Sequence, residues 1–182
     1  MLLNFKFSNF RSFKEETNFT MIPCSKRMHN EYIIRTDGNK STIRSLPVSV
    51  IYGANASGKS NVILAMYILK KIITFGTLDS KELLPFLNVL PFMHDESYYE
   101  PTKLEITFSQ NGNVYRYGIS LKTMFKKHSI VEEYLYINED NIFERGLQTG
   151  VSMCIHELVK KGHIPKNDTP EAFYDTLLKK LN

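Results

Sequence analysis

The stretch "GANASGKS", residues 53 to 60, constrains the fold of this chain more than any other feature. It matches the pattern G-x-x-x-x-G-K-[S/T] at every fixed position. Small residues let a backbone wrap closely around a phosphate chain with its N–H groups pointing inward, and a helix that follows adds unpaired N–H groups and a positive dipole end. "VSVIY" precedes the loop and an amphipathic pattern follows it. The sequence therefore predicts a strand, a phosphate-binding loop and a helix.

Each position of this loop has an expected role, and ATP with Mg²⁺ is the expected ligand. Lys59 is predicted to reach the β- and γ-phosphates, and the Ser60 hydroxyl to ligate Mg²⁺. A chance match in a glycine-containing turn is the alternative, and it would arise in about 1% of chains of this length. The predicted cofactor-binding residues of the loop are Gly53, Asn55, Ala56, Ser57, Gly58, Lys59, Ser60 and Asn61.

The predicted helix runs from Gly58 to about Phe75, and Gly76 is a plausible C-terminal stop. One apolar stripe marks it as amphipathic, and the stripe consists of Val62, Ile63, Met66, Tyr67, Ile72 and Ile73. The preceding "VSVIY" has no polar alternation, which is typical of a strand buried on both faces.

Alternating patterns predict several further strands. "LLNFKFSNF" and "ETNFTMI" read as neighbouring strands near the N-terminus, and Asp37-Gly38 predicts a small peripheral hairpin. "KLEITFSQNGNVYRYGISL" is a hairpin with its turn at Asn111-Gly112, and "SIVEEYLYI" is a third strand beside it. We expect one short helix within residues 77–102.

These elements predict an α/β fold of the P-loop NTPase kind. We expect a mixed sheet around "VSVIYG" with the helix packed on it, an antiparallel β subdomain from about 103 to 137, and a helical C-terminal tail. In the tail, Thr169 and Pro170 suit the cap and first turn of a helix. The domain division that we predict is 1–146 for the main lobe and 147–182 for a tail of uncertain role.

Composition indicates a cytoplasmic protein. No apolar stretch approaches the roughly 20 residues that span a bilayer, and charged residues interrupt the apolar pattern of the N-terminus, as they would not in a signal peptide. Cys24 and Cys154 have no metal-ligand spacing and read as reduced thiols. The net charge of +4 permits an acidic partner such as nucleic acid without arguing for one.

Together, "FKFSNFRSFKEE" and "VIYGANASGKSN" resemble the ABC-type ATPase heads of the SMC, RecF and OLD kind, including bacterial ATP-binding proteins of phage-defence and abortive-infection systems. "PFMHDESYYEPTKLEITF", "NVYRYGISL", "IVEEYLYI" and "IFERG" extend the resemblance to residues 1–146. It implies that Arg11, in the "NFRSF" element, lies near the nucleotide phosphates. A solvated arginine at a strand edge is the alternative.

Hydrolysis needs a carboxylate beside Mg²⁺ and a group that orients water. Two stretches of the chain only partly resemble the acidic motif that supplies these groups. Asp95-Glu96 follows an interrupted apolar run, and Glu139-Asp140 follows an alternating strand. For each stretch, the alternative to a catalytic role is a surface turn. "LQTG", at 147–150, faintly resembles the family's signature motif but lacks its serine. His156 and His163 are too far apart for a zinc helix. The catalytic residues therefore stay unknown.

The resemblance implies a cytoplasmic ATPase head that dimerises around ATP and drives a partner acting on nucleic acid, in a defence system among other settings. The expected partners are a second ATPase head or a missing C-terminal lobe, together with an effector protein, and no membrane. A truncated chain and one segment of a split ATPase both fit the absence of a second lobe. The alternative function is a non-hydrolysing nucleotide-binding or assembly module.

Overall fold

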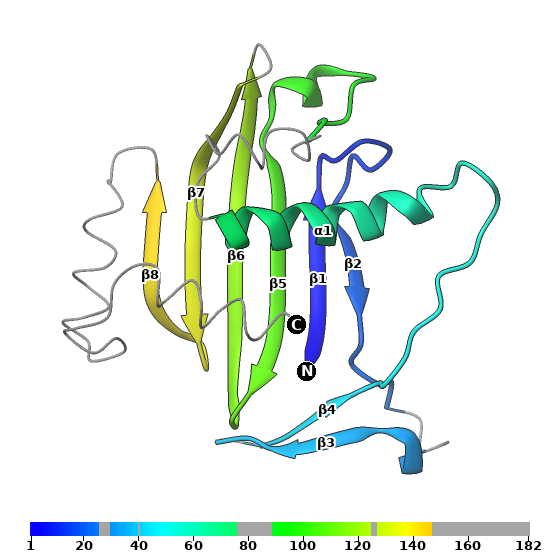
Figure 1. The fold of residues 1–182 in the computed structure, drawn as a ribbon, viewed down its shortest axis with the longest axis vertical. Coiled ribbons are helices and arrows are strands. Elements are labelled where there is room, and N and C mark those ends of the chain that lie inside the picture. Colours follow the sequence, from blue (N-terminus) through cyan, green and yellow to red (C-terminus); the bar gives the residue numbers. More distant parts are fainter. Residues whose placement is uncertain (26–29, 40, 76–88, 125–126, 147–182) are drawn as a thin grey trace.

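The computed structural model describes residues 1–25, 30–39, 41–75, 89–124 and 127–146. Its elements are β1 (Leu2–Ser8), β2 (Thr17–Thr20), η1 (Asn30–Tyr32), β3 (Ile34–Asp37), β4 (Thr42–Ser45), α1 (Lys59–Phe75), η2 (Glu96–Tyr99), β5 (Thr102–Gln110), β6 (Asn113–Met124), β7 (Lys127–Ile137) and β8 (Asp140–Gly146). Six strands form one antiparallel sheet in the order β2-β1-β5-β6-β7-β8, and β3 and β4 form a separate hairpin (Figure 1).

The strand pairings predicted from alternation are confirmed. β1 pairs with β2 in the antiparallel sense, with Phe5 opposite Phe19, and β5, β6 and β7 follow one another as neighbours. The β3–β4 hairpin confirms the turn expected around Asp37-Gly38. In strands such as β1, β5 and β6, alternate side chains are buried in the core that also contains the buried side chains of α1. A shift of register by one residue would expose that apolar set.

Turn chemistry fixes the hairpins. Asn111 and Gly112 have φ values of 48° and 76°, the left-handed pair that a tight β-hairpin requires. Asn138 and Glu139 repeat this geometry, with φ values of 52° and 76°, between β7 and β8. Residues 103–137 are thus no separate subdomain, because they continue the sheet that β1 begins.

Helix α1 crosses one face of the sheet (Figure 1). Its buried side chains are Val62, Ala65, Ile68, Leu69, Ile72 and Ile73. Ile63 and Tyr67 were predicted on this face but are 58% and 39% exposed. The prediction was wrong there because α1 is apolar around most of its circumference, so periodicity alone does not select the side that meets the sheet.

The segment before the phosphate loop differs most from its prediction. Residues 48–52 form no strand, and Val48, Val50 and Tyr52 are 70%, 75% and 89% exposed. The described sheets are antiparallel throughout, so the expected mixed sheet around "VSVIYG" is wrong for the described residues. β-Branched composition supplies only a propensity, which needs neighbouring strands to act on, and no described strand pairs with this segment.

A buried charge ties β8 to the sheet. Glu133 on β7 is only 4% exposed, and its carboxylate accepts a hydrogen bond of 2.6 Å from the Tyr117 hydroxyl. Arg145 on β8 pairs with the other carboxylate oxygen. Because a buried carboxylate without a partner is costly, the Glu133–Arg145 pair helps to set the register of β8.

Several predictions lie outside the described residues. These are the stop at Gly76, most of 77–102 before η2, "LQTG", the two histidines of the tail, Cys154 and the helical tail of 147–182. In the described part of the chain, no helix combines the length and apolarity that crossing a membrane requires.

Candidate nucleotide-binding site

The phosphate loop is an irregular turn that leads directly into α1. Two of its residues adopt left-handed backbone conformations, with φ values of 63° at Ala56 and 93° at Gly58. Such alternating conformations make a backbone turn sharply enough to point several N–H groups at one anion. Gly53, Asn55, Ala56, Ser57 and Ser60 are exposed. The loop therefore offers an open, backbone-lined surface at the start of a helix that is 17 residues long.

Lys59 folds back over this loop. Its Nζ donates hydrogen bonds to the carbonyl oxygens of Gly53 at 2.9 Å and Ala54 at 2.7 Å. These bonds hold the ammonium against the loop, where an anion bound to the backbone N–H groups would meet it. Ser60 occupies the next position of α1. The residue types and their placement fit a phosphate with Mg²⁺.

The N-terminal connection between β1 and β2 meets the phosphate loop. Phe10 and Phe13 exchange two backbone hydrogen bonds, of 2.8 and 2.9 Å, around a turn whose two central residues are Arg11 and Ser12. The Asn61 Nδ2 donates to the Ser12 Oγ at 2.9 Å. Figure 1 shows this connection beside the N-terminal part of α1. The structure thus brings together the two motifs that lie over 40 residues apart in the sequence.

Arg11 sits in this turn with a φ of 52°, a conformation that is uncommon for a residue other than glycine. Its backbone N–H donates to the Leu90 carbonyl oxygen at 2.8 Å, and its guanidinium lies 5.9 Å from the centre of the Phe10 ring. The Arg11 Nε is buried and has no hydrogen-bond partner in the described residues. Its role toward a nucleotide stays a prediction.

Asn9 anchors the turn to the segment before β5. Its Nδ2 donates to the carbonyl oxygens of Ser97 at 2.7 Å and Glu100 at 2.8 Å. Its Oδ1 accepts from the Phe92 N–H at 2.9 Å. Asn9 is 5% exposed and has a φ of 50°, which asparagine tolerates better than most residues. This side chain fixes the base of the turn.

The first acidic candidate has a structural role. Asp95 caps η2 by accepting from the Ser97 N–H at 2.8 Å, and it pairs with the Lys14 Nζ at 2.7 Å. The hydrogen bonds from Lys14 and Ser97 lower the pKa of the Asp95 carboxyl from 3.8 to about 2. Asp95 therefore secures the connection of η2 to the N-terminal turn.

Acid should weaken this connection in a defined pH window. Since the folded-state pKa of Asp95 is about 2, below its usual 3.8, the contribution of Asp95 to stability is present above pH 3.8 and is lost as pH falls toward 2. We expect urea unfolding of the Asp95→Asn variant to depend less on pH in that window than unfolding of the parent does. An identical pH dependence would contradict the role of this cap.

The second acidic candidate lies in the β7–β8 turn. Glu139 holds the second left-handed position of that turn, and Asp140 begins β8. The preceding Asn138 is fixed by its Oδ1, which accepts from the Val114 N–H at 2.8 Å. These contacts are typical of a surface turn, the alternative to a catalytic role for this stretch.

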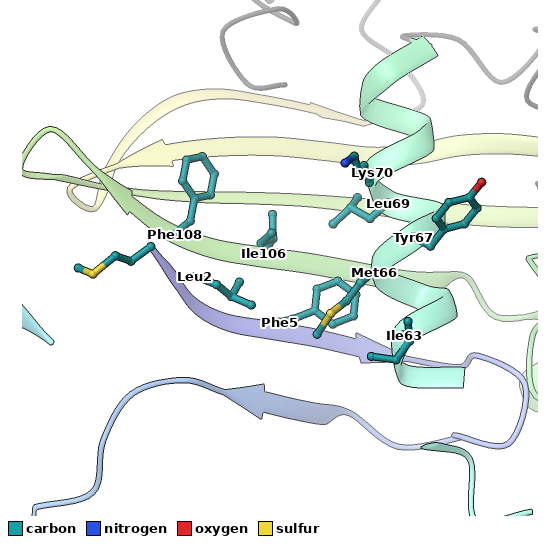
Figure 2. Close-up of a pocket in the computed structure, with 10 residues that line it drawn as sticks. Leu2, Phe5, Ile63, Met66, Tyr67, Leu69, Lys70, Ile106 and Phe108 are labelled. Atoms are coloured by element: carbon teal, nitrogen blue, oxygen red, sulfur yellow. The ribbon is translucent and has the colours of Figure 1, made fainter. Parts of the chain in front are cut away.

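An apolar cavity of about 470 Å³ lies between α1 and the sheet, away from the phosphate loop. Figure 2 shows side chains of β1 and β5 facing those of α1 across it. The lining residues are Met1, Leu2, Phe5, Ile63, Met66, Tyr67, Leu69, Lys70, Ile106 and Phe108. Apart from Lys70, the side chains that line it are apolar or aromatic, so the phosphate loop is the better candidate for a nucleotide.

Sequence reasoning missed three residues of this region, namely Asn9, Ser12 and Phe13. The available signal was the unit "NFRSF", in which two aromatic residues flank two polar ones. That spacing suits a two-residue turn with both rings turned toward the core, and Phe10 is fully buried and Phe13 partly buried. Contact with the phosphate loop is a tertiary feature that the spacing does not reveal.

Comparison with known proteins identifies a protein family that matches this part of the chain. A family model described as "AAA domain, putative AbiEii toxin, Type IV TA system" matches residues 48–143, just over half of the chain. The match includes the phosphate loop, α1 and strands β5 to β7. Among curated proteins, no sequence matches this chain.

Proposed function

The chain belongs to this family of AAA domains, and from that premise we propose that it binds Mg-ATP through residues 53–61 as part of an ATPase head. The observation that carries the proposal is the complete G-x-x-x-x-G-K-S loop at the start of α1, with the Lys59 ammonium lying on it. Lys59 serves the β- and γ-phosphates, Ser60 ligates Mg²⁺, and Arg11 approaches the phosphates from the β1–β2 turn.

The proposed setting is an ABC-type head of the SMC, RecF and OLD kind, in a cytoplasmic system directed at nucleic acid or at phage. The family description names a toxin of a toxin–antitoxin system, which supports a defence role. A second head or a second lobe acts as the partner. Val48, Val50 and Tyr52 precede the phosphate loop and have exposed apolar side chains. They support the need for such a partner, because an exposed apolar patch marks an interaction surface.

A non-hydrolysing nucleotide-binding module is the second candidate function. It is favoured by the engagement of Asp95 in a cap and of Glu139 in a tight turn. In such a module, occupancy of the loop by nucleotide controls assembly.

ATP turnover by the purified chain tests whether this chain hydrolyses ATP unaided. Without a partner, we expect steady-state turnover no faster than that of the Lys59→Ala variant. Hydrolysis needs a group that orients water, and Asp95 is engaged in a cap while Glu139 lies in a tight turn. Phosphate release at saturating Mg-ATP is the measurement. Turnover that exceeds this control and disappears in Glu96→Gln or Glu139→Gln would identify a working carboxylate and establish hydrolysis by this chain.

A further inference from the structure

We propose that Ser12 and Phe13 form a clamp on the phosphate loop, and that Ser12 is a positioning residue for nucleotide binding that acts through Asn61. The inference rests on the proposed function, since it names what shapes the same loop. Three sets of contacts carry it. They are a hydrogen bond to Asn61, close packing on Gly58, and the rigid attachment of the clamp to the core.

The hydrogen bond joins two distant segments at one asparagine. The Asn61 side chain donates to the Ser12 Oγ at 2.9 Å, while the Asn61 backbone N–H donates to the Gly58 carbonyl oxygen at 2.8 Å. Asn61 is therefore attached to the loop through its backbone and to the N-terminal turn through its side chain. Loss of the Ser12 hydroxyl would release the second attachment and leave the first intact.

The packing involves Gly58 itself. A Cβ atom at Gly58 would lie 2.8 Å from two ring carbons of Phe13 and 2.8 Å from the Ser12 Oγ. Gly58 also has a φ of 93°, which glycine adopts without the strain that a side chain imposes. The clamp thus occupies the space beside the loop at the residue where the loop enters α1.

The clamp is rigid because its base belongs to the core. The Phe13 ring packs edge-on against the Phe7 ring with centroids 4.9 Å apart, and Phe7 is only 1% exposed. The two backbone bonds between Phe10 and Phe13 close the turn. The left-handed Arg11 in that turn is held by the Leu90 carbonyl oxygen. Backbone strain of this kind persists only where surrounding contacts enforce it.

A rigid neighbour matters for a loop that binds through its backbone. Ordering a mobile loop on binding costs conformational entropy, and a loop held in its binding shape avoids part of that cost. Supporting contacts also keep the binding groups at their working positions. Since Ser12 is exposed, removal of its hydroxyl should affect nucleotide affinity more than the stability of the fold.

A double-mutant cycle with Ser12→Ala and Asn61→Ala tests the clamp. We expect each single variant to raise the Kd for Mg-ATP, by about three- to tenfold for Ser12→Ala, and the double variant to bind no more weakly than the weaker single variant. Ser12→Thr should restore affinity, because it keeps the hydroxyl. Titration calorimetry gives the Kd values. Effects that multiply independently in the double variant would overturn the proposal.

Ser129→Ala is the matched control, because this exposed serine on β7 donates to Lys122 rather than to the loop. It should leave the Kd unchanged, and urea unfolding should give similar stabilities for it and for Ser12→Ala. A parent chain without Mg-ATP binding would defeat the proposed function, and the clamp is then tested by hydrogen exchange without nucleotide. We expect faster exchange of the Asn61 and Val62 amides in Ser12→Ala than in the parent or Ser12→Thr. Equal exchange in all three would overturn the clamp.

Discussion

Replacement of Lys59 by alanine should weaken Mg-ATP binding by about 2 kcal/mol or more, a rise in Kd of roughly 30-fold. Bonds from an ammonium to phosphate are charge-assisted and stronger than neutral hydrogen bonds. In the structure the Lys59 amine rests on the Gly53 and Ala54 carbonyl oxygens, so the side chain already lies over the loop. Titration calorimetry of parent and variant measures the loss.

Lys71→Ala is a suitable control for charge, because it removes one cation from the same helix about 18 Å along the axis. It should leave the Kd nearly unchanged. Chelation of Mg²⁺ should weaken binding by the parent and have a smaller effect on Ser60→Ala, which lacks the proposed metal ligand. Equal affinity of Lys59→Ala and the parent would remove the nucleotide assignment altogether.

Gly118→Ala should lower the free energy of unfolding by about 3 kcal/mol. A Cβ atom at Gly118 would lie 2.1 Å from Cζ and 2.3 Å from the hydroxyl oxygen of Tyr134, the residue opposite on β7. The ring is fixed in place because its hydroxyl donates to the Glu105 Oε2 at 2.6 Å. Burial and this bond raise the pKa of Tyr134, so the hydroxyl stays a donor at neutral pH. Urea unfolding measures the change.

The same substitution in a Tyr134→Ala background should be nearly neutral, because the ring that clashes is gone. Gly146→Ala on β8 is the matched control. Among the described residues, a Cβ atom there would approach only the Val131 carbonyl oxygen, at 3.9 Å, and we expect a change within about 0.5 kcal/mol. If the Gly118→Ala variant were as stable as the parent, the Tyr134 ring would have to move aside without lowering the free energy of unfolding.

Sequence patterns predicted local structure well wherever the cause is local. The hairpin at Asn111-Gly112 follows from two residues that accept positive φ. Helix α1 follows from a long apolar-periodic segment after Gly58, and the described helix begins at Lys59. The phosphate loop is recognisable because its glycines, lysine and serine act through their own spacing. The same pattern predicted its ligand, which the Lys59 and Ser60 variants test.

Features that depend on distant neighbours were missed or mistaken. Residues 48–52 have the composition of a strand, but none of the described strands pairs with them, and Val50 is exposed. The burial of α1 side chains depends on how closely each part of the helix approaches the sheet. Ile63 lines the cavity beside the sheet and is 58% exposed. The position of β8 depends on the ion pair between its Arg145 and the buried Glu133 of β7. None of these causes is visible within a short window of sequence.

The phosphate loop, the helix after it and the Asn111-Gly112 hairpin can be read from short stretches of residues, because turn conformation, helix periodicity and strand alternation are set by residues close together in the chain. The folded structure was needed to show that the Ser12 hydroxyl and the Phe13 ring lie against Gly58, and that Asn9 fixes the turn which carries them. These contacts join segments about 50 and 90 residues apart. They form only when the core around Phe7 brings the N-terminal strand and α1 together, since packing of buried side chains acts between residues irrespective of their separation in sequence.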